Sequence, residues 1–151
     1  MGTRYRGTPE EIRALNAFIN LIRASSSLEV RINRHLQEVP LTPGQFGVLE
    51  VLFHCGSLCQ SDLGGKLLTS GPNITLVVDN LEKRGLAQRE RSKEDRRFVS
   101  VKLTDQGRAL VQKIFPKHAR IIAEQFTVLS VRDQEELRRL CRKLGKGRDG
   151  S

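Results

Sequence analysis

The stretch from Ser70 to Gly107 constrains the fold most, because it places an amphipathic helix directly before two short strands and a charged turn. The inward face of the predicted helix is apolar at the i, i+3, i+4, i+7 spacing, at Ile74, Val77, Val78 and Leu81. Gly85 ends the helix, since glycine readily adopts the left-handed conformation that follows many helices. Strands are predicted over 86–91 and 98–103, where apolar and polar residues alternate.

A helix followed by a hairpin with a basic tip is typical of a winged helix-turn-helix, which places the helix in a DNA major groove and the tip in the neighbouring minor groove. We therefore predict two sets of DNA-contacting residues. The set at the start of the helix comprises Ser70, Gly71, Asn73, Thr75 and Leu76. The set on the hairpin, which is the predicted wing, comprises Arg91, Lys93, Asp95, Arg96 and Arg97.

Two further helices complete the predicted DNA-binding module over residues 42–103. The first begins at Thr42, whose side chain can form a capping box with Gln45. The second is a short helix over 61–68, reached through an extended link at 57–59.

Long helices flank this module at both ends of the chain. A helix of about 30 residues ends at Pro40, and it is too long to be stable without packing against other elements. A second helical region covers 104–146, with Pro116 bending its middle. Their surplus apolar stripes indicate a dimerisation layer built from 8–38 and 104–146. The expected fold is mainly α with a small β-wing, in a single domain of residues 1–151.

The charge of the chain points to a polyanionic partner. Its 26 lysines and arginines exceed its 17 acidic residues, which gives a formal net charge of +9. Such an excess favours nucleic acids, because neutralising phosphates releases condensed counterions. No apolar run reaches the roughly 20 residues that cross a bilayer, and the N-terminus lacks the apolar segment of a signal peptide. We therefore expect no membrane partner and a cytoplasmic location.

Four segments, in this order and spacing, carry a family resemblance. They are Leu41 to Leu49, Asp79 to Leu86, Asp95 to Arg97, and Val101 to Gly107. Through them the chain resembles the MarR family of bacterial transcriptional regulators over nearly its whole length. The resemblance implies a homodimer that binds a palindromic operator in double-stranded DNA, usually as a repressor, and that responds to a small phenolic or other aromatic acid or to an oxidant.

The resemblance also assigns roles to individual residues. Arg97 would enter the minor groove while Asp95 holds it, which agrees with the ability of a nearby carboxylate to fix a guanidinium group. Leu76 departs from the family, because many members carry an arginine there. A leucine can contact a thymine methyl group but cannot make the bidentate guanine contact. The stretches 70–75 and 114–118 look more like the branch that senses quinones and related phenols.

Members of the family bind effectors between their first, second and fifth helices. The residues that we assign to this pocket are His35, Phe46, Phe115 and His118. His35 and His118 are isolated in the sequence, so each is alternatively an ordinary half-buried histidine.

The three cysteines are an odd number and argue against a disulfide framework. Cys59 falls near a helix N-terminus, which favours the thiolate, so a cysteine-based redox-responsive regulator is one alternative. Cys55 is otherwise expected to be a small core residue, and Cys141 to pack in an apolar stripe.

Other functions are disfavoured by what the sequence lacks. Only His54 lies near the first two cysteines, and no second ligand pair has zinc spacing, so we expect no metal. No nucleophile–base pair or nucleotide-binding loop can be assembled, so we expect neither an enzyme nor a cofactor. A non-specific architectural nucleic-acid-binding protein is the alternative from another class, since the net charge would suit it.

Overall fold

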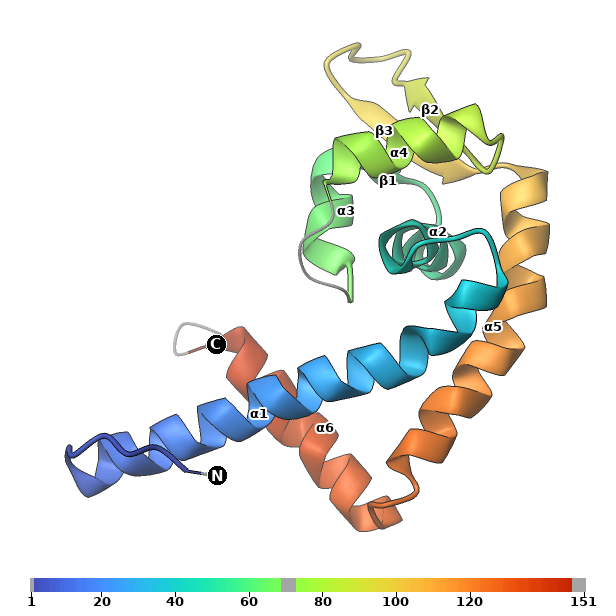
Figure 1. The fold of residues 1–151 in the computed structure, drawn as a ribbon. Helices are drawn as coiled ribbons and strands as arrows, with labels where there is room; N and C mark the ends of the chain where they lie inside the picture. Colours follow the sequence, from blue (N-terminus) through green and yellow to red (C-terminus); the bar gives the residue numbers. More distant parts are fainter. Residues whose placement is uncertain (1, 69–72, 148–151) are drawn as a thin grey trace.

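The fold is built around α2, Pro43–Cys55, which lies at the centre of one end of the molecule in this computed structural model of residues 2–68 and 73–147 (Figure 1). Thr42 caps α2 with the predicted capping box: its hydroxyl accepts from the Gln45 amide at 3.2 Å, and the Gln45 side chain accepts from the Thr42 amide at 3.0 Å. Most of α2 is buried, including Val48, Leu49 and Leu52, because α4, α5 and β3 pack around it.

The other elements follow in chain order. They are α1 (Pro9–Asn33), the 3₁₀ helix η1 (Arg34–Glu38), β1 (Leu58–Cys59), α3 (Gln60–Lys66), α4 (Ile74–Lys83), β2 (Ala87–Arg91), β3 (Val99–Leu103), α5 (Asp105–Phe126) and α6 (Val131–Lys146). The expected mainly helical fold with a small β-wing is confirmed.

The sheet contains three antiparallel strands in the order β1-β3-β2. In the wing, Arg91 of β2 lies opposite Val99 of β3. The predicted extended link at 57–59 proves to contain β1, in which Leu58 pairs with Val101 of β3. A strand of two residues is too short to show a period-2 pattern, which is why the sequence did not reveal it.

The first helix is shorter than expected, because α1 ends at Asn33 and the chain tightens into η1. Val39, which precedes Pro40, is extended with φ −124° and ψ 151°, as the steric clash with a following proline requires. The tighter turn of η1 brings His35 and Leu36 inward, and both are buried.

The long helix α5 joins the wing to the opposite end of the molecule and changes direction near its middle, where Pro116 lies within the helix (Figure 1). At its start, Gly107 packs against the backbone of Leu86, and an added Cβ would meet the Leu86 carbonyl oxygen at 1.9 Å. Only glycine therefore allows the start of α5 to approach the backbone of Leu86 this closely.

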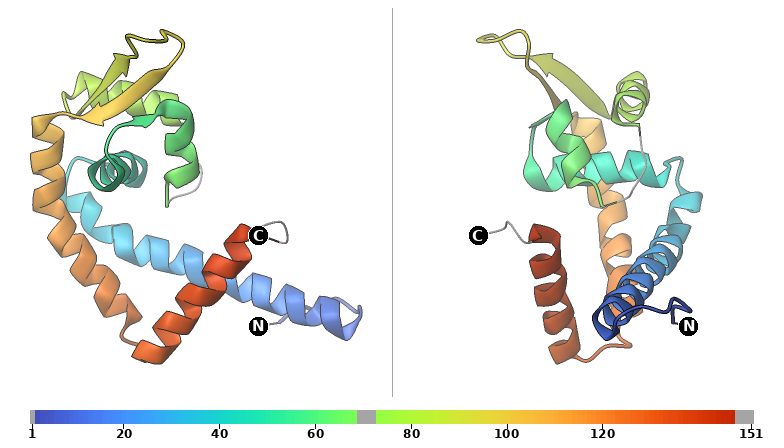
Figure 2. Two further views of the ribbon diagram at one scale, coloured as in Figure 1. Left: turned by 180° about the vertical axis from the view of Figure 1, so that it is seen from behind. Right: turned by 90° about the vertical axis from the view of Figure 1, so that its left-hand side faces the viewer.

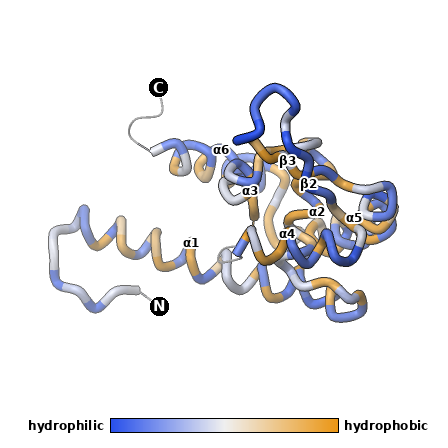
Figure 3. The backbone as a smooth tube through the Cα atoms, turned by 90° about the horizontal axis from the view of Figure 1, so that it is seen from above, coloured by the Kyte–Doolittle hydropathy of each residue, from blue (hydrophilic) through white to orange (hydrophobic). Residues whose placement is uncertain are grey.

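Helix α6 and the lower half of α5 form an open V, and α1 packs against α5 on the side away from the wing (Figures 1 and 2). No residue of α1 or α6 is buried. Figure 3 shows apolar positions recurring along α1 outside the module, while the wing tip is hydrophilic. Cys141 of α6 is exposed, and Cys55 at the end of α2 is exposed as well, so the expectations that they pack in apolar surroundings are wrong for the single chain. No helix of the described ranges is both long and apolar enough to cross a membrane.

Candidate nucleic-acid interface and effector pocket

Helix α4 presents one buried face and one exposed face. Val78 and Leu81 are fully buried against the module, whereas Leu76 points outward with 66% of its surface exposed. Thr75 is also exposed. The exposed face of α4 therefore begins with methyl groups and little charge. This is what a leucine in place of an arginine at position 76 predicts. The predicted DNA contacts Ser70 and Gly71 lie outside the described residues.

Helix α4 begins later than expected, at Ile74, because Asn73 is its N-cap. The Asn73 side-chain oxygen accepts from the Leu76 amide at 3.3 Å. That oxygen is therefore engaged with the helix backbone, and the side-chain amide group is what Asn73 can offer to a base.

The wing tip holds Arg97 in a defined place. Arg97 donates from Nη2 to Asp95 Oδ2 at 2.7 Å and from Nε to Oδ1 at 3.0 Å, and its backbone amide also donates to Oδ1 at 3.0 Å. The side chain of Arg97 stays 87% exposed. The hydrogen bonds from Arg97 lower the pKa of Asp95, so the carboxylate remains charged at neutral pH. The predicted fork between Asp95 and Arg97 is present, and its contact with DNA stays a prediction.

The remaining wing residues gather beside this fork. Arg91, Lys93 and Arg96, together with Ser92, line a shallow depression on the hairpin. Its three cations have the chemistry of a phosphate contact.

A further residue that the sequence did not single out, Arg89 of β2, connects the wing to α4. Its guanidinium pairs with Asp79 at 2.6 Å and with Glu82, and it also donates to the Thr75 carbonyl at 3.3 Å and to the Gln60 side chain at 3.1 Å. Gln60 of α3 donates in turn to the Thr75 hydroxyl at 2.9 Å. The start of the exposed face of α4 is thus held by hydrogen bonds from two neighbouring elements.

A second network joins α2 to the far end of α4. Gln45 donates from Nε2 to Asn80 Oδ1 at 2.9 Å, and Arg84 donates to Gln45 Oε1 at 3.3 Å. The N-terminal turn of α2 is therefore linked to the C-terminal half of α4 by side-chain hydrogen bonds.

The four residues assigned to the effector pocket come together in space. His35 and His118 share a hydrogen bond of 2.8 Å between Nε2 and Nδ1. The Phe46 ring lies 4.8 Å from the His118 ring, and the Phe115 ring lies 6.2 Å from it. Burial, assisted by His35, lowers the pKa of His118 to about 4, and burial is also the main reason that the pKa of His35 is lowered. Both imidazoles are neutral at pH 7.

A cavity of about 240 Å³ lies beside this pair, between α1, α2 and α5. It is lined by Ser25, Leu28, Glu29, Ile32, Asn33, Pro43, Phe46, Gly47, Glu50, Leu68, His118, Ile122 and Phe126. Phe46 and His118 therefore line the cavity. His35 and Phe115 do not line it but lie next to His118. The sequence did not single out Glu29, Asn33 or Glu50, which line the cavity beside the apolar residues.

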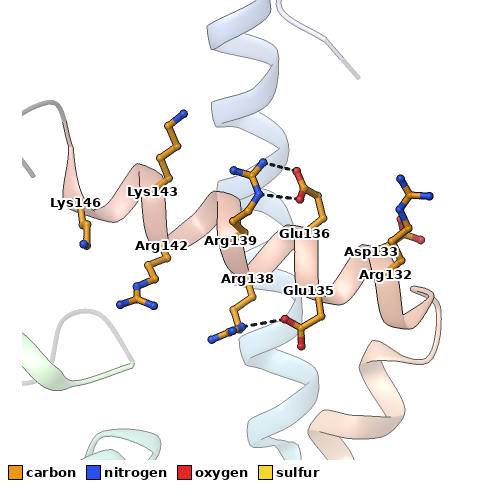
Figure 4. A pocket seen from close by; sticks show the side chains of 9 residues that line it. All are labelled: Arg132, Asp133, Glu135, Glu136, Arg138, Arg139, Arg142, Lys143 and Lys146. Atoms are coloured by element: carbon orange, nitrogen blue, oxygen red, sulfur yellow. Dashed lines mark hydrogen bonds and ion pairs between the residues drawn. The ribbon is translucent and has the colours of Figure 1, made fainter. Parts of the chain in front are cut away.

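A larger depression has a different character. It runs along α6 and is lined by charged side chains alone, as Figure 4 shows: Arg132, Asp133, Glu135, Glu136, Arg138, Arg139, Arg142, Lys143 and Lys146. Two i, i+3 ion pairs organise it, Arg139 with Glu136 at 2.6 Å and Arg138 with Glu135 at 3.3 Å. It is the solvated face of an amphipathic helix rather than a pocket for an apolar ligand.

The predicted redox residue, Cys59, is the N-cap residue of α3 and is partly buried. Its side chain makes no capping hydrogen bond. In the described residues, no three histidine, cysteine or acidic side chains come together as metal ligands.

Comparison with known proteins gives a consistent assignment. The model of the MarR family matches residues 41–99. The HTH-type transcriptional regulator MhqR of Bacillus subtilis is 37% identical over 133 residues, which cover 88% of this chain and 92% of MhqR.

Two solved structures share the fold. One is that of Bordetella bronchiseptica BpsR, whose DNA binding is regulated by 6-hydroxynicotinic acid; it has a TM-score of 0.72 and 29% identity, covering 85% of this chain and 98% of its own. The structure of NadR in complex with 4-hydroxyphenylacetate has a TM-score of 0.75 and 26% identity, covering 97% of this chain and 99% of its own.

Proposed function

This chain belongs to the MarR family of transcriptional regulators, and from that premise we propose that it is a repressor that binds a palindromic operator as a homodimer in the bacterial cytoplasm. A small aromatic effector that occupies the cavity beside His118 releases it from DNA.

One observation carries the DNA-binding part of this proposal. Helix α4 and the β2–β3 hairpin, whose turn carries Arg97, lie at the same end of the molecule, opposite α1 and α6 (Figures 1 and 2). A helix and a basic hairpin tip on one surface can occupy adjacent major and minor grooves. The free exposure of Arg97 and its fixed orientation by Asp95 suit insertion into a narrow groove, where negative potential is enhanced.

The homodimer is supported by the apolar residues that α1 and α6 leave uncovered. Phe18 and Val30 of α1 are 60% and 66% exposed, and Leu140 and Leu144 of α6 are 48% and 66% exposed. A second copy would cover these faces and would place two α4 helices on successive turns of a duplex, about 34 Å apart.

Effector control is supported by the position of α2. Pro43 and Phe46 line the cavity, while Gln45 between them is bonded to Asn80 of α4. A ligand that displaces the first turn of α2 therefore displaces α4, and only a ligand that prefers one of the two arrangements can shift the balance between them. The aromatic ligands of BpsR and NadR, 6-hydroxynicotinic acid and 4-hydroxyphenylacetate, support the same class of effector.

The test begins with selection of bound sequences from random duplex DNA, followed by anisotropy titrations of the selected site. Arg97→Ala should weaken binding and reduce the slope of log affinity against log salt, because a cation is removed from the interface. Arg120→Ala is the control, since Arg120 is an exposed arginine of α5 outside the wing. Equal affinities and slopes for wild type and Arg97→Ala would remove the wing from the mechanism.

A further inference from the structure

The bases that the start of α4 can recognise are limited first by its lack of positive charge. The sequence holds no lysine or arginine between Lys66 and Lys83, and Lys83 is the last residue of α4. The bidentate contact of a cationic side chain with guanine is therefore not available here. The described residues that are exposed at this end of α4 are Asn73, Thr75 and Leu76.

The two side-chain amides at the start of α4 have their oxygens engaged within the protein. Asn73 Oδ1 accepts from the Leu76 amide at 3.3 Å, and Gln60 Oε1 accepts from Arg89 Nε at 3.1 Å. A bidentate contact with adenine uses the oxygen and the nitrogen of one amide together. Because both oxygens are engaged, what these amides can still offer to a base is an N–H donor.

The hydroxyl group of Thr75 is restricted in the same sense. It accepts from Gln60 Nε2 at 2.9 Å, and its own hydrogen is left to donate. The polar groups at the start of α4 therefore act as donors. Donors are matched by acceptor atoms in the major groove and are opposed by cytosine, which presents an amino group there.

Leu76 adds an apolar requirement to these donors. Its side chain is 66% exposed, and its place is fixed, because Asn73 caps its amide while the Thr75 carbonyl accepts from Arg89 at 3.3 Å. Against guanine, a leucine would cover two acceptors without offering a donor, which costs free energy. Thymine alone among the bases presents both an acceptor, O4, and a methyl group in the major groove.

We propose that Leu76 reads a thymine at one fixed position of each operator half-site through its C5-methyl group, and that the donors of Asn73 and Thr75 exclude cytosine from this position. The inference rests on the proposed function and specifies one base pair of its operator. Leu76 then determines sequence specificity, while Gln60 and Arg89 are positioning residues that hold the turn from which it projects.

The experiment places four pyrimidines in turn at each thymine of the selected operator, in both half-sites, and measures binding of the full chain by anisotropy. Uracil removes only the methyl group, whereas 5-methylcytosine keeps the methyl group and replaces O4 by an amino group; cytosine changes both. At one position, we expect uracil to weaken binding by about fourfold per half-site, which corresponds to one buried methyl group. We expect 5-methylcytosine to weaken it by about tenfold or more, because donors then face a donor.

Leu76→Ala should bind the thymine and uracil operators almost equally, because the methyl group has lost its partner. It should still prefer uracil to cytosine, since the donors of Asn73 and Thr75 remain. Val128→Ala is the matched control, since Val128 is an aliphatic residue between α5 and α6 that is 86% exposed, and it should keep the wild-type preference for thymine over uracil. Circular dichroism shows whether each variant is folded.

The outcomes separate this inference from the proposed function. If selection yields a specific operator in which no thymine shows a methyl effect, the inference falls and sequence-specific binding stands. The same holds if the methyl effect is as large in Leu76→Ala as in wild type, or if 5-methylcytosine binds as well as thymine. If random DNA yields no preferred sequence, the inference and the proposed function fall together.

Discussion

At the scale of single residues, the most unusual feature is the buried histidine pair. His35 and His118 are 83 positions apart in sequence and share one hydrogen bond of 2.8 Å, so one imidazole must donate and the other must accept. Protonating both would place two donors against each other in a poorly solvated place. The geometry therefore disfavours the doubly protonated pair, and burial disfavours protonation of either ring.

The burial of His118 predicts how stability depends on pH. Because the pKa of folded His118 is about 4 and that of an unfolded histidine is about 6.5, the unfolded chain binds the extra proton between these values. The free energy of unfolding should be unaffected above pH 6.5 and should fall, by up to about 3 kcal/mol, as pH drops towards 4. Urea unfolding at pH 7.0, 5.5 and 4.5 and constant protein concentration measures it. His118→Gln should lose less stability over this range than wild type, whereas His54→Gln, which alters an exposed histidine, should behave as wild type.

Single residues also mark the limit of what the sequence could predict. The residues around His118 were assigned through family resemblance, and the structure brings all four together, although it places Phe115 and His35 behind the cavity wall. Glu50 was not predicted, because nothing in the sequence distinguishes a glutamate facing a cavity from one facing solvent. Only the packing of three helices makes that difference.

At the scale of elements, Arg89 determines how the wing and α4 are joined. Arg89 lies on β2 opposite Val101, at a half-buried position of a strand whose other charged residues are exposed. Its guanidinium pairs with two carboxylates of α4. Those hydrogen bonds and charges raise the pKa of Arg89 against the effect of burial, so it stays charged. Without it, Asp79 and Glu82 would present two uncompensated negative charges near bound phosphates.

We therefore expect Arg89→Met to weaken operator binding by about tenfold or more, and the triple variant with Asp79→Asn and Glu82→Gln to recover most of the loss. Anisotropy titrations across a range of salt concentrations measure both effects. Arg108→Met, at an exposed arginine of α5, controls for loss of one positive charge. A triple variant no better than Arg89→Met would mean that Arg89 acts through packing or through direct contact with DNA.

Elements with strong local signals were predicted well. Thr8, Thr42 and Ser130 all cap helices with the capping boxes or cap residues that their sequences indicated. The errors lie where local signals are weak: β1 exists only because β3 offers it a partner, and η1 forms because Leu36 reaches the core by a tighter turn.

At the scale of the whole molecule, one chain cannot cover its own apolar surface. Leu137, Leu140 and Leu144 recur on one face of α6 and remain exposed, opposite the charged face of Figure 4. This separation of faces along a single helix is typical of helices that pack against a partner.

Leu140→Glu should therefore convert the proposed homodimer to a monomer and abolish high-affinity operator binding, since one α4 helix would contact one half-site alone. Sedimentation velocity gives the oligomeric state, and circular dichroism shows whether the module remains folded. Lys143→Glu on the charged face of α6 is the control, and it should leave the assembly intact. A wild-type chain that sediments as a monomer at micromolar concentration would contradict the proposed dimer.

Helix α5 runs without interruption from the wing to the opposite end of the molecule, with Pro116 near its middle. A change of the bend angle at Pro116 would therefore move the wing. The arm between Asp105 and Pro116 is roughly 16 Å long, so each degree of flexion at the proline swings its far end by roughly 0.3 Å. Distances between spin labels on the two wings of a dimer, with and without effector, would record such a swing. His118 lies two residues beyond Pro116, so we expect a ligand that contacts His118 to act close to the bend of α5 and thereby to shift the position of the wing.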